Sequence, residues 1–307
     1  MSLDLGYVAL ALRDPHRGER FFGDELGLPR GAMDLDGEEI PVFKIGTAAL
    51  ALFRAGHSFL SGRVPAGVDH LGLTTSKTGP RKLVREPAPR PGPQGKVQRH
   101  LPTDLTCGVC LRISEPLSFD FDGKGSKIVE RLDHIGIAST DNAAAEAFYT
   151  GTLGLAYESR QTDMELRAPF ESFTSDKYGV AYHPRTPEPV GGLKVSFVTL
   201  GDCELEFLQD FDPAMGSEVH HGSAGTTKQD QGVVGKFVNR HGAGLHHLAL
   251  KTLNIDDSLA QLARRGHRVI DRVGRPGSRR ARIGFLHPVT TGGVLLHLVE
   301  RIDPDRR

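Results

Sequence analysis

Four ionisable side chains interrupt apolar, strand-like runs in the second half of this 307-residue chain. They are His134 in RLDHIGIA, Glu206 in GDCELEFLQ, His247 in GAGLHHLAL and His297 in GGVLLHLVE. Alternation along a strand places each of them among apolar neighbours, where an unbonded polar group costs roughly 2–7 kcal/mol. A shared divalent metal ion would satisfy all of them, because imidazole nitrogens and carboxylates are ordinary metal ligands.

Each of these residues has a structural explanation when it is taken alone. A single histidine in an apolar strand is more often a hydrogen-bonded core residue than a metal ligand. Glu206 alone could face water from one side of an alternating strand. Their places within an internal repeat favour the metal site over these explanations.

The chain contains four related segments. YVALALRDPHRGERFFGDELGLP from Tyr7 aligns without a gap with HIGIASTDNAAAEAFYTGTLGL from His134. A second type of start occurs at His70 in VDHLGLTT and at His247 in LHHLAL. Each unit begins with a strand and a helix and closes with further strands, which is a βαβββ pattern. The second unit is rich in proline, glycine and arginine after Thr75, and we predict that it is eroded.

The candidate ligands occupy matching places in this repeat. His134 and Glu206 lie in the first and last strands of the third unit, and His247 and His297 lie in the same strands of the fourth. Pairing of equivalent units would bring the four side chains to one point. The repeat therefore predicts one metal site in the second half of the chain.

Four such units resemble the vicinal oxygen chelate superfamily, which contains glyoxalase I, extradiol dioxygenases, fosfomycin-resistance proteins and methylmalonyl-CoA epimerase. The second half, from RLDHIGIASTD through KFVNRHGAGLHHLAL to TTGGVLLHLVE, is similar to the epimerases. The resemblance implies an α+β fold of four tandem βαβββ modules, the second eroded, that form two vicinal-oxygen-chelate domains. We expect a degenerate N-terminal domain without metal, residues 1–120, and a metal-binding catalytic domain, residues 130–302.

The same resemblance implies that His134, Glu206 and His247 are metal ligands. Glyoxalase I and the epimerases carry a glutamate at the fourth position, where this chain has His297. We predict that His297 is a fourth ligand or a catalytic base and that Glu206 is also catalytic. The ligand set does not distinguish zinc, nickel, cobalt, manganese and iron(II). His246 replaces an aspartate of the other copies and is predicted to point away from the metal.

The first half has lost most of these ligands. The equivalent positions are Tyr7, Ala51, His70 and Arg112, of which only His70 is a good ligand. We therefore predict that the N-terminal domain binds no metal and serves packing, dimerisation or closure of the active cleft. His70 is predicted to be a core histidine.

Three other motifs have a structural and a functional interpretation. The arginine-rich segment 275–282 is usually a solvated loop, but the resemblance places it near the substrate cleft, where it would bind an anionic group. His220 and His221 lie in a polar, glycine-rich loop and are predicted to be solvated. Cys107 and Cys110 are predicted to be unreactive thiols in a strand.

These features predict a metal-dependent epimerase or isomerase that acts on a carbonyl compound through an enolate. The substrate would be a CoA thioester or a keto-cyclitol such as 2-epi-5-epi-valiolone, because tandem members of the superfamily include keto-cyclitol epimerases. Glu165 and Tyr182 are candidates for a second base. One alternative is an iron(II) extradiol-type ring-cleaving dioxygenase, and another is a non-catalytic binding protein of the bleomycin-resistance type.

Composition limits the partners. Lys plus Arg and Asp plus Glu are equal at 38 each, so no overall charge attracts nucleic acid or a membrane surface. Three cysteines argue against a disulfide framework, and no run approaches the ~18 apolar residues of a membrane span. No charged segment followed by an apolar run opens the chain. We expect a cytoplasmic homodimer with a small-molecule carbonyl substrate that carries an anionic group.

Overall fold

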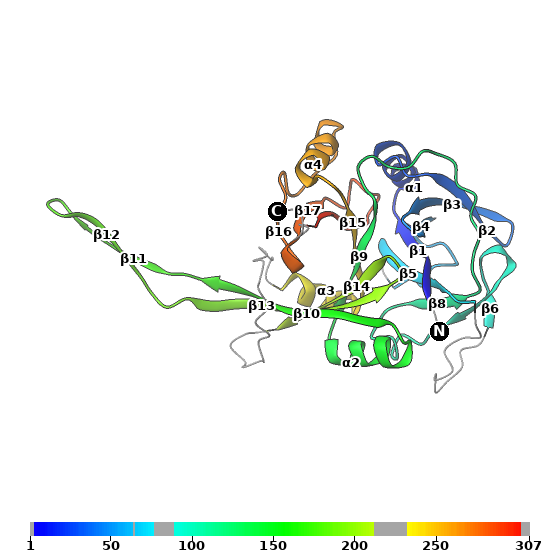
Figure 1. The fold of residues 1–307 in the computed structure, drawn as a ribbon, viewed down its shortest axis with the longest axis horizontal. Coiled ribbons are helices and arrows are strands. Elements are labelled where there is room, and N and C mark those ends of the chain that lie inside the picture. The colour runs from blue at the N-terminus through cyan, green and yellow to red at the C-terminus, as the bar shows by residue number, and fades with distance from the viewer. Residues whose placement is uncertain (1–2, 64, 77–88, 212–231, 302–307) are drawn as a thin grey trace.

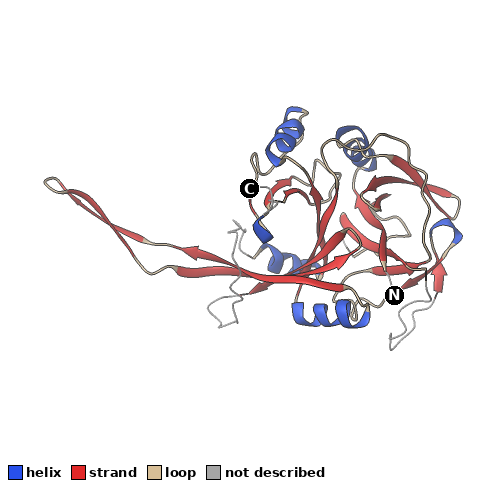
Figure 2. Ribbon diagram, viewed as in Figure 1, coloured by secondary structure: helices blue, strands red, loops and turns tan. Residues whose placement is uncertain are grey.

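Two curled β-sheets lie side by side and form the body of the protein, with short helices on the outside (Figures 1 and 2). The computed structural model describes residues 3–63, 65–76, 89–211 and 232–301. Each sheet has eight strands, and the order of the strands in one sheet repeats that in the other. The predicted α+β fold of tandem vicinal-oxygen-chelate domains is therefore confirmed.

The first sheet has the strand order β2-β3-β4-β1-β5-β8-β7-β6. The central β1 and β5 are antiparallel and join the first two modules. Residues 77–88, where a helix of the second module would fall, lie outside the described residues. The strands are β1 (Asp4–Leu12), β2 (Arg30–Leu35), β3 (Glu38–Ile45), β4 (Ala48–Arg54), β5 (Gly67–Thr74), β6 (Pro89–Pro91), β7 (Val97–His100) and β8 (Leu111–Ser114).

The second sheet has the order β10-β13-β14-β9-β15-β18-β17-β16, in which β9 and β15 take the central places of β1 and β5. β9 pairs with β14 in parallel and with β15 antiparallel, and β15 pairs with β18 in parallel. The four strands β14, β9, β15 and β18 are thus direct neighbours. The strands are β9 (Arg131–Ser139), β10 (Ala156–Arg167), β13 (Glu188–Leu200), β14 (Cys203–Phe211), β15 (Gly244–Lys251), β16 (Arg275–Pro276), β17 (Arg282–Leu286) and β18 (Leu296–Glu300).

Three helices begin at polar caps. Asp14, Asp141 and Asn254 each accept a hydrogen bond from the backbone N–H three residues later, at 3.0, 3.0 and 3.1 Å. No helix in the described part of the chain is long and apolar enough to cross a membrane. The helices are α1 (Pro15–Glu19), η1 (Arg20–Glu25), η2 (Pro93–Gly95), α2 (Asn142–Glu146), η3 (Ala147–Thr152), α3 (Val233–His241), α4 (Ile255–Arg264) and η5 (Ser278–Arg280).

One apolar core continues through both halves of the body, since a single cluster of buried side chains takes residues from both sheets. Polar contacts add to it at the boundary. The Tyr149 hydroxyl donates to the Thr106 carbonyl at 3.2 Å, and Asp202 accepts from the backbone and the hydroxyl of Thr47 at 3.0 and 2.7 Å. These contacts hold the second sheet in a fixed place against the first.

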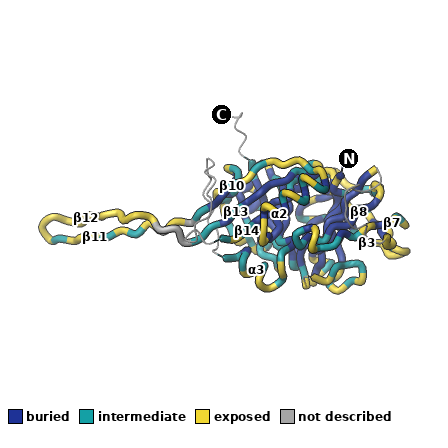
Figure 3. Tube along the Cα trace, turned by 90° about the horizontal axis from the view of Figure 1, so that it is seen from below, coloured by how far each residue is buried: buried dark blue, intermediate teal, exposed yellow. Residues whose placement is uncertain are grey.

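A two-stranded hairpin, β11 (Phe170–Ser175) and β12 (Gly179–Pro184), extends far beyond the body (Figures 1 and 3). We call this hairpin the arm. It continues the long β10–β13 pair, whose counterpart β2–β3 in the first sheet ends in a short turn after Leu35. The segment from Asp163 to Gly192, an insertion in the third module with no counterpart of similar length in the first, therefore forms a long ribbon.

The prediction that Cys107 and Cys110 lie in a strand is wrong, because Cys107 lies in a turn and Cys110 directly precedes β8. Cys107 and Gly108 have φ values of 53° and 88°, a left-handed conformation that a strand does not accommodate. Burial raises the pKa of both thiols, which makes them poor nucleophiles.

Candidate metal centre

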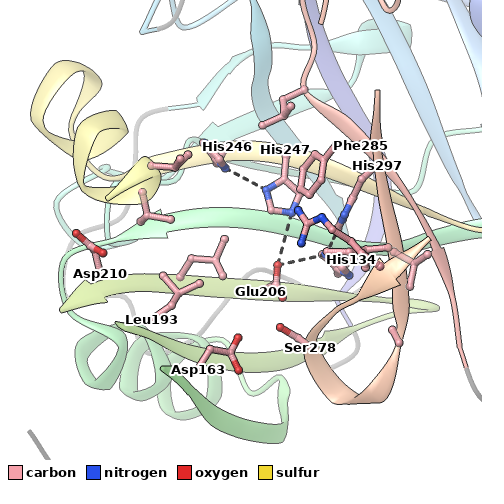
Figure 4. A pocket seen from close by; sticks show the side chains of 18 of the residues that line it. His134, Asp163, Leu193, Glu206, Asp210, His246, His247, Ser278, Phe285 and His297 are labelled. Atoms are coloured by element: carbon pink, nitrogen blue, oxygen red, sulfur yellow. Dashed lines mark hydrogen bonds and ion pairs between the residues drawn. The ribbon is translucent and has the colours of Figure 1, made fainter. Parts of the chain in front are cut away.

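The four predicted ligands meet at one point inside the second sheet (Figure 4). His134 comes from β9, Glu206 from β14, His247 from β15 and His297 from β18. All four side chains are buried, with relative exposures of 3–4%. One ring nitrogen of each histidine lies within 4.8 Å of those of the other two.

Glu206 and His134 lie at the centre of the cluster. Glu206 Oε2 is 3.2 Å from His134 Nε2 and 3.5 Å from His247 Nε2. His134 Nε2 is also 3.1 Å from His297 Nε2. Metal–ligand bonds of 2.0–2.2 Å place neighbouring donor atoms about 3.0–3.5 Å apart, so this spacing suits one ion.

Two β-bulges orient the imidazoles. The pairing of β9 with β15 shifts register at Asp133 and again at His246, so each is an extra residue just before a histidine of the cluster. Asp133 Oδ1 lies 2.8 Å from His134 Nδ1, and His246 Nδ1 lies 3.0 Å from His247 Nδ1. The prediction that His246 points away is wrong: the bulge turns its side chain toward the cavity and against His247.

A small residue lies opposite each of these two rings. His247 pairs with Gly136 and His134 with Ala249 across the β9–β15 ladder. A Cβ atom on Gly136 would lie 2.0 Å from Cε1 of His247, so only glycine leaves room for this ring. The spacing His-Ile-Gly in β9 therefore positions one ligand and makes room for another.

Asp133 fixes the orientation of His134. Burial raises the pKa of Asp133, but hydrogen bonds from His134 and Arg301 lower it by more than burial raises it. The pKa of Asp133 is therefore far below its usual range. The Arg301 Nε donates to Asp133 Oδ2 at 2.9 Å. An ionised Asp133 keeps the proton of His134 on Nδ1 and turns the Nε2 lone pair toward the cluster.

The remaining charges are strongly coupled. Burial lowers the pKa of His134, but Glu206 and Asp133 raise it more, to about 9. Burial raises the pKa of Glu206, but His134 and His247 lower it well below its ordinary value. Burial and the neighbouring histidines lower the pKa of His297. An anionic carboxylate among three imidazoles is a donor set that attracts a cation.

Two buried nitrogens test this fit. His247 Nε2 and His297 Nδ1 are shielded from water and have no hydrogen-bond partner. The Nε2 atom of His134 faces both Glu206 Oε2 and His297 Nε2, at 3.2 and 3.1 Å, although a protonated His134 has only one Nε2 proton to donate. Hydrogen bonds within the protein thus leave the cluster incompletely satisfied. The residues fit a divalent cation, and their nitrogen and oxygen donors leave its identity open.

The cluster opens into a cavity of about 330 Å³ (Figure 4). Its wall is mainly apolar and includes Leu193, Phe197, Leu208, Val234, Ile283 and Val299. Asp163, Asp210, Arg275 and Arg301 also line it. A cavity of this size suits a small molecule held against a polar cluster.

Aromatic rings support the cluster from both sides. Phe285 stacks on His297 with ring centroids 4.5 Å apart and an interplanar angle of 29°. Phe197 meets His134 edge to face at 6.4 Å. Roles for Phe285, Asp133 and Arg301 at this site were not predicted from the sequence. Pairing of β17 with β18 is the signal that places Phe285 at the site, because Phe285 lies directly opposite His297 in that ladder.

The arginine-rich segment divides between the cavity and its rim. Arg275 lines the cavity, and its guanidinium lies 5.5 Å from the Phe285 ring. The Arg279 guanidinium lies over the Phe197 ring, 3.7 Å from its centroid, and binds Glu204 and Glu158 at 2.6 and 3.0 Å. It thereby joins η5 to β10 and β14. Only the first of these arginines can meet a ligand in the cavity directly.

In the equivalent cluster of the first sheet, both ring nitrogens of the histidine have hydrogen-bond partners. His70 is buried, with Nε2 3.1 Å from the Tyr7 hydroxyl and Nδ1 2.6 Å from Asp69. Gln98 Nε2 donates to the same hydroxyl at 2.9 Å. Arg112 donates to the Phe59 carbonyl at 2.7 Å, and Ala51 offers no donor. His70 is the core histidine that was expected.

Two other candidates lie away from the cluster or outside the described residues. Tyr182 is 70% exposed on the arm, and it does not line the cavity. Glu165 pairs with Gly191 through its backbone, and its side chain lies outside what the structure describes. His220 and His221 also fall outside the described residues.

Comparison with known proteins agrees with the predicted resemblance. The model of the Glyoxalase/Bleomycin resistance protein/Dioxygenase superfamily matches residues 133–285. The uncharacterized protein YqjC of Bacillus subtilis is 28% identical over 172 residues, which are 56% of this chain and 93% of YqjC. The mitochondrial methylmalonyl-CoA epimerase of Bos taurus is 26% identical over 168 residues, which are 55% of this chain and 73% of that protein.

A solved structure resembles both halves together. A mutant of 4-hydroxymandelate synthase from Streptomyces coelicolor covers 98% of this chain and 93% of its own, with a TM-score of 0.59 and 14% identity. At this identity the likeness concerns the fold alone. The tandem architecture is thus shared over the whole chain, while the sequence likeness lies in the second half.

Substitution of Gly136 by alanine should weaken metal binding about 10–100-fold, as loss of a residue that orients a ligand does. The added Cβ would displace the His247 ring, whereas a Cβ on Gly151 meets nothing within 4 Å. Competition with a chromogenic chelator measures the affinity, and Gly151→Ala is the matched control. Equal affinities of Gly136→Ala and the wild type would contradict this account of the ring position.

Metal uptake should release about one proton at neutral pH. The pKa of His134 is raised to about 9, so that below this pH the metal-free imidazole carries a proton that an ion must displace. Affinity should therefore fall about tenfold for each pH unit from 8 to 6. Calorimetry in buffers of different protonation enthalpy counts the released protons, and a pH-independent affinity would exclude His134 as a ligand.

Proposed function

We propose that this chain, whose residues 133–285 match the model of the Glyoxalase/Bleomycin resistance protein/Dioxygenase superfamily, is a metal-dependent epimerase or isomerase acting on a carbonyl compound. The observation that carries the proposal is the buried meeting of His134, Glu206, His247 and His297 beside an apolar cavity. The likeness of the same half to methylmalonyl-CoA epimerases supports it.

We assign the metal to the second domain, residues 130–302, and none to residues 1–120. His134, Glu206 and His247 would hold one divalent ion. When bound, the ion would polarise a substrate carbonyl and stabilise negative charge on its oxygen. Asp133 orients His134, and the apolar wall keeps water away from the reacting carbon.

Epimerisation requires that a proton leave the carbon next to the carbonyl and return to its other face. Glu206 is ionised at neutral pH, because the histidines around it lower its pKa despite burial. His297 is neutral, because burial and the same histidines lower its pKa. Both groups can therefore accept a proton. His297 is either the proton-transfer group of a three-ligand site or the fourth ligand.

Arg275 is suited to hold an anionic group of the substrate. Its Nε binds Asp271 at 3.2 Å, while its Nη1 is enclosed and has no hydrogen-bond partner. The guanidinium lies over Phe285, which stacks on His297, so Arg275 is one ring away from the cluster. A carboxylate or phosphate on the substrate would complete its hydrogen bonds. Such a group occurs in CoA thioesters of dicarboxylic acids.

The donor set also supports a second candidate. His134, His247 and Glu206 form a two-histidine, one-carboxylate set, which is typical of iron(II) oxygenases that open positions to substrate and oxygen. In this interpretation His297 would be an additional base beside the iron. Oxygen uptake with a catechol, dependent on ferrous iron, would establish this candidate in place of the epimerase.

The proposed epimerase should exchange a substrate proton with solvent only when metal is bound. We expect deuterium from D₂O to enter methylmalonyl-CoA or 2-epi-5-epi-valiolone with loaded enzyme and not after chelation, as read by mass spectrometry. His297→Gln should lower the exchange rate about 10²–10⁴-fold. If it does so with metal content unchanged, His297 is the base; if metal is lost, it is a ligand.

Absence of exchange from both substrate classes, with stoichiometric metal present, would contradict the epimerase. The non-catalytic binding protein would be favoured by two results together. The protein would take up no stoichiometric metal, and a chelator would change the thermal stability of the wild type and of His134→Ala equally. The matched control for both measurements is His57→Gln, a partly exposed histidine that pairs with Glu38 in the first sheet.

Arg275→Gln should weaken binding of 2-oxoglutarate to the metal-loaded protein about tenfold or more, since a charge-assisted hydrogen bond contributes about 1.5–3 kcal/mol. The same substitution should change the affinity for 2-oxobutyrate by no more than about twofold, because this ligand lacks the distal carboxylate. Calorimetric titration measures both ligands. Arg282→Gln is the matched control, because Arg282 binds Asp256 at 2.7 Å and does not line the cavity. Equal losses for both ligands would show that Arg275 does not recognise the anion.

A further inference from the structure

The arm has one face without charge. β11 and β12 pair from Phe170 with Pro184 to Ser175 with Gly179, and alternation sorts their side chains onto two faces. One face carries Glu171 and His183, and Glu171 forms an ion pair with Arg185. The other, which we call the uncharged face, consists of Phe170, Ser172, Thr174, Val180, Tyr182 and Pro184.

The large side chains of the uncharged face are exposed. Phe170, Val180 and Tyr182 have relative exposures of 64%, 52% and 70%. Figure 3 shows the arm as a mostly exposed ribbon that stands clear of the body. Exposed strands in soluble proteins usually carry charged residues or proline that discourage pairing with other chains. Aromatic side chains are exposed on both faces of the arm, but Phe173 contacts His183 on the charged face, whereas the uncharged face has no charged residue that would oppose pairing with another chain.

The arm also needs a partner for its own stability. A two-stranded hairpin without a covered face is at best marginally stable in water. The body gives no such cover, since the arm pairs only within itself in the part of the chain that the structure describes. Its length is about 20 Å, from six paired positions at about 3.4 Å each. Among residues 3–63, 65–76, 89–211 and 232–301 no element packs on the uncharged face, so this face is available to a second molecule.

We propose that the arm is a dimerisation element whose uncharged face docks on a second copy of this chain. Phe170 and Tyr182, at 64% and 70% exposure, leave about 270 Å² uncovered, at roughly 200 Å² for each aromatic side chain. In a two-fold dimer each copy buries its own arm and receives another, so these two side chains alone contribute about 540 Å² per copy toward the roughly 800 Å² of a standard stable interface.

Charge and geometry both favour a second copy over a different protein. The chain has a formal net charge of +0, so two copies do not repel each other at long range. The loop that joins α4 to β16 lies on the side of the body from which the arm projects (Figure 1). Its Ile270 and Val273 are 55% and 65% exposed. Two copies related by a two-fold axis can therefore lay each arm across this loop of the other.

This arrangement places the arm of one copy at the active cavity of the other. Ile270 belongs to this exposed loop and also lines the cavity. The root of the arm, at Met164 and Leu193, lines the cavity of its own chain. The dimer contact thus adjoins the substrate cavity from both sides. The inference rests on the arm and its faces and does not depend on the reaction proposed above.

The experiment measures mass in solution by multi-angle light scattering and sedimentation from 1 to 100 μM. We expect wild-type protein at twice the chain mass of 33.3 kDa. Tyr182→Glu places a charge on the uncharged face and should weaken association at least tenfold, and Val273→Glu should do the same from the receiving loop. Phe173→Glu, on the charged face of the same hairpin, is the matched control and should remain dimeric.

Tyr182, Val273 and Phe173 are all exposed, so each variant should fold. Circular dichroism and metal affinity verify this for each variant. Wild-type protein that is monomeric at 100 μM would overturn the proposal. So would a dimer that Tyr182→Glu and Phe173→Glu weaken equally. A dimer that Tyr182→Glu dissociates and Val273→Glu does not would overturn the assigned docking loop.

Discussion

The burial of one carboxylate among three imidazoles is the constraint on which the second sheet depends. Each of these side chains would be costly inside an apolar sheet, and within the protein His297 Nδ1 has no hydrogen-bond partner and His247 Nε2 has only a 3.5 Å contact with Glu206. A shared cation resolves the cost for all of them at once. The bulges at Asp133 and His246, the glycine opposite His247 and the Asp133–Arg301 pair all serve to aim donor atoms at that point.

The first sheet meets the same constraint in a different way. Its backbone repeats the strand order and also shifts register just before His70, which places Asp69 against the imidazole. The Tyr7 hydroxyl then occupies the other ring nitrogen. The same scaffold thus holds two arrangements: in the first half a histidine whose two ring nitrogens are hydrogen-bonded, and in the second half a cluster of donors that opens into a cavity. The difference between packing and chemistry lies in a few side chains on shared strands.

The internal repeat made the fold and the meeting of the four candidate residues predictable. Equivalent strands in paired modules become neighbours in a sheet, so residues as far apart as His134 and His297 could be placed together from sequence. Features that depend on register were not predictable. His246 was assigned to the wrong side because strict alternation hides a bulge. Arg301 and Phe285 became visible only when β9, β17 and β18 were paired, and the insertion in the third module gave no sign that it forms a ribbon.

The central claim is that these side chains hold one metal ion, and X-ray absorption at the metal edge tests it most directly. The account predicts one ion per chain with two or three imidazoles and a carboxylate oxygen in its coordination sphere, at about 2.0–2.2 Å. His134→Ala should remove an imidazole from that sphere or abolish loading. Protein with no stoichiometric ion, or an ion with at most one imidazole neighbour, would contradict the account.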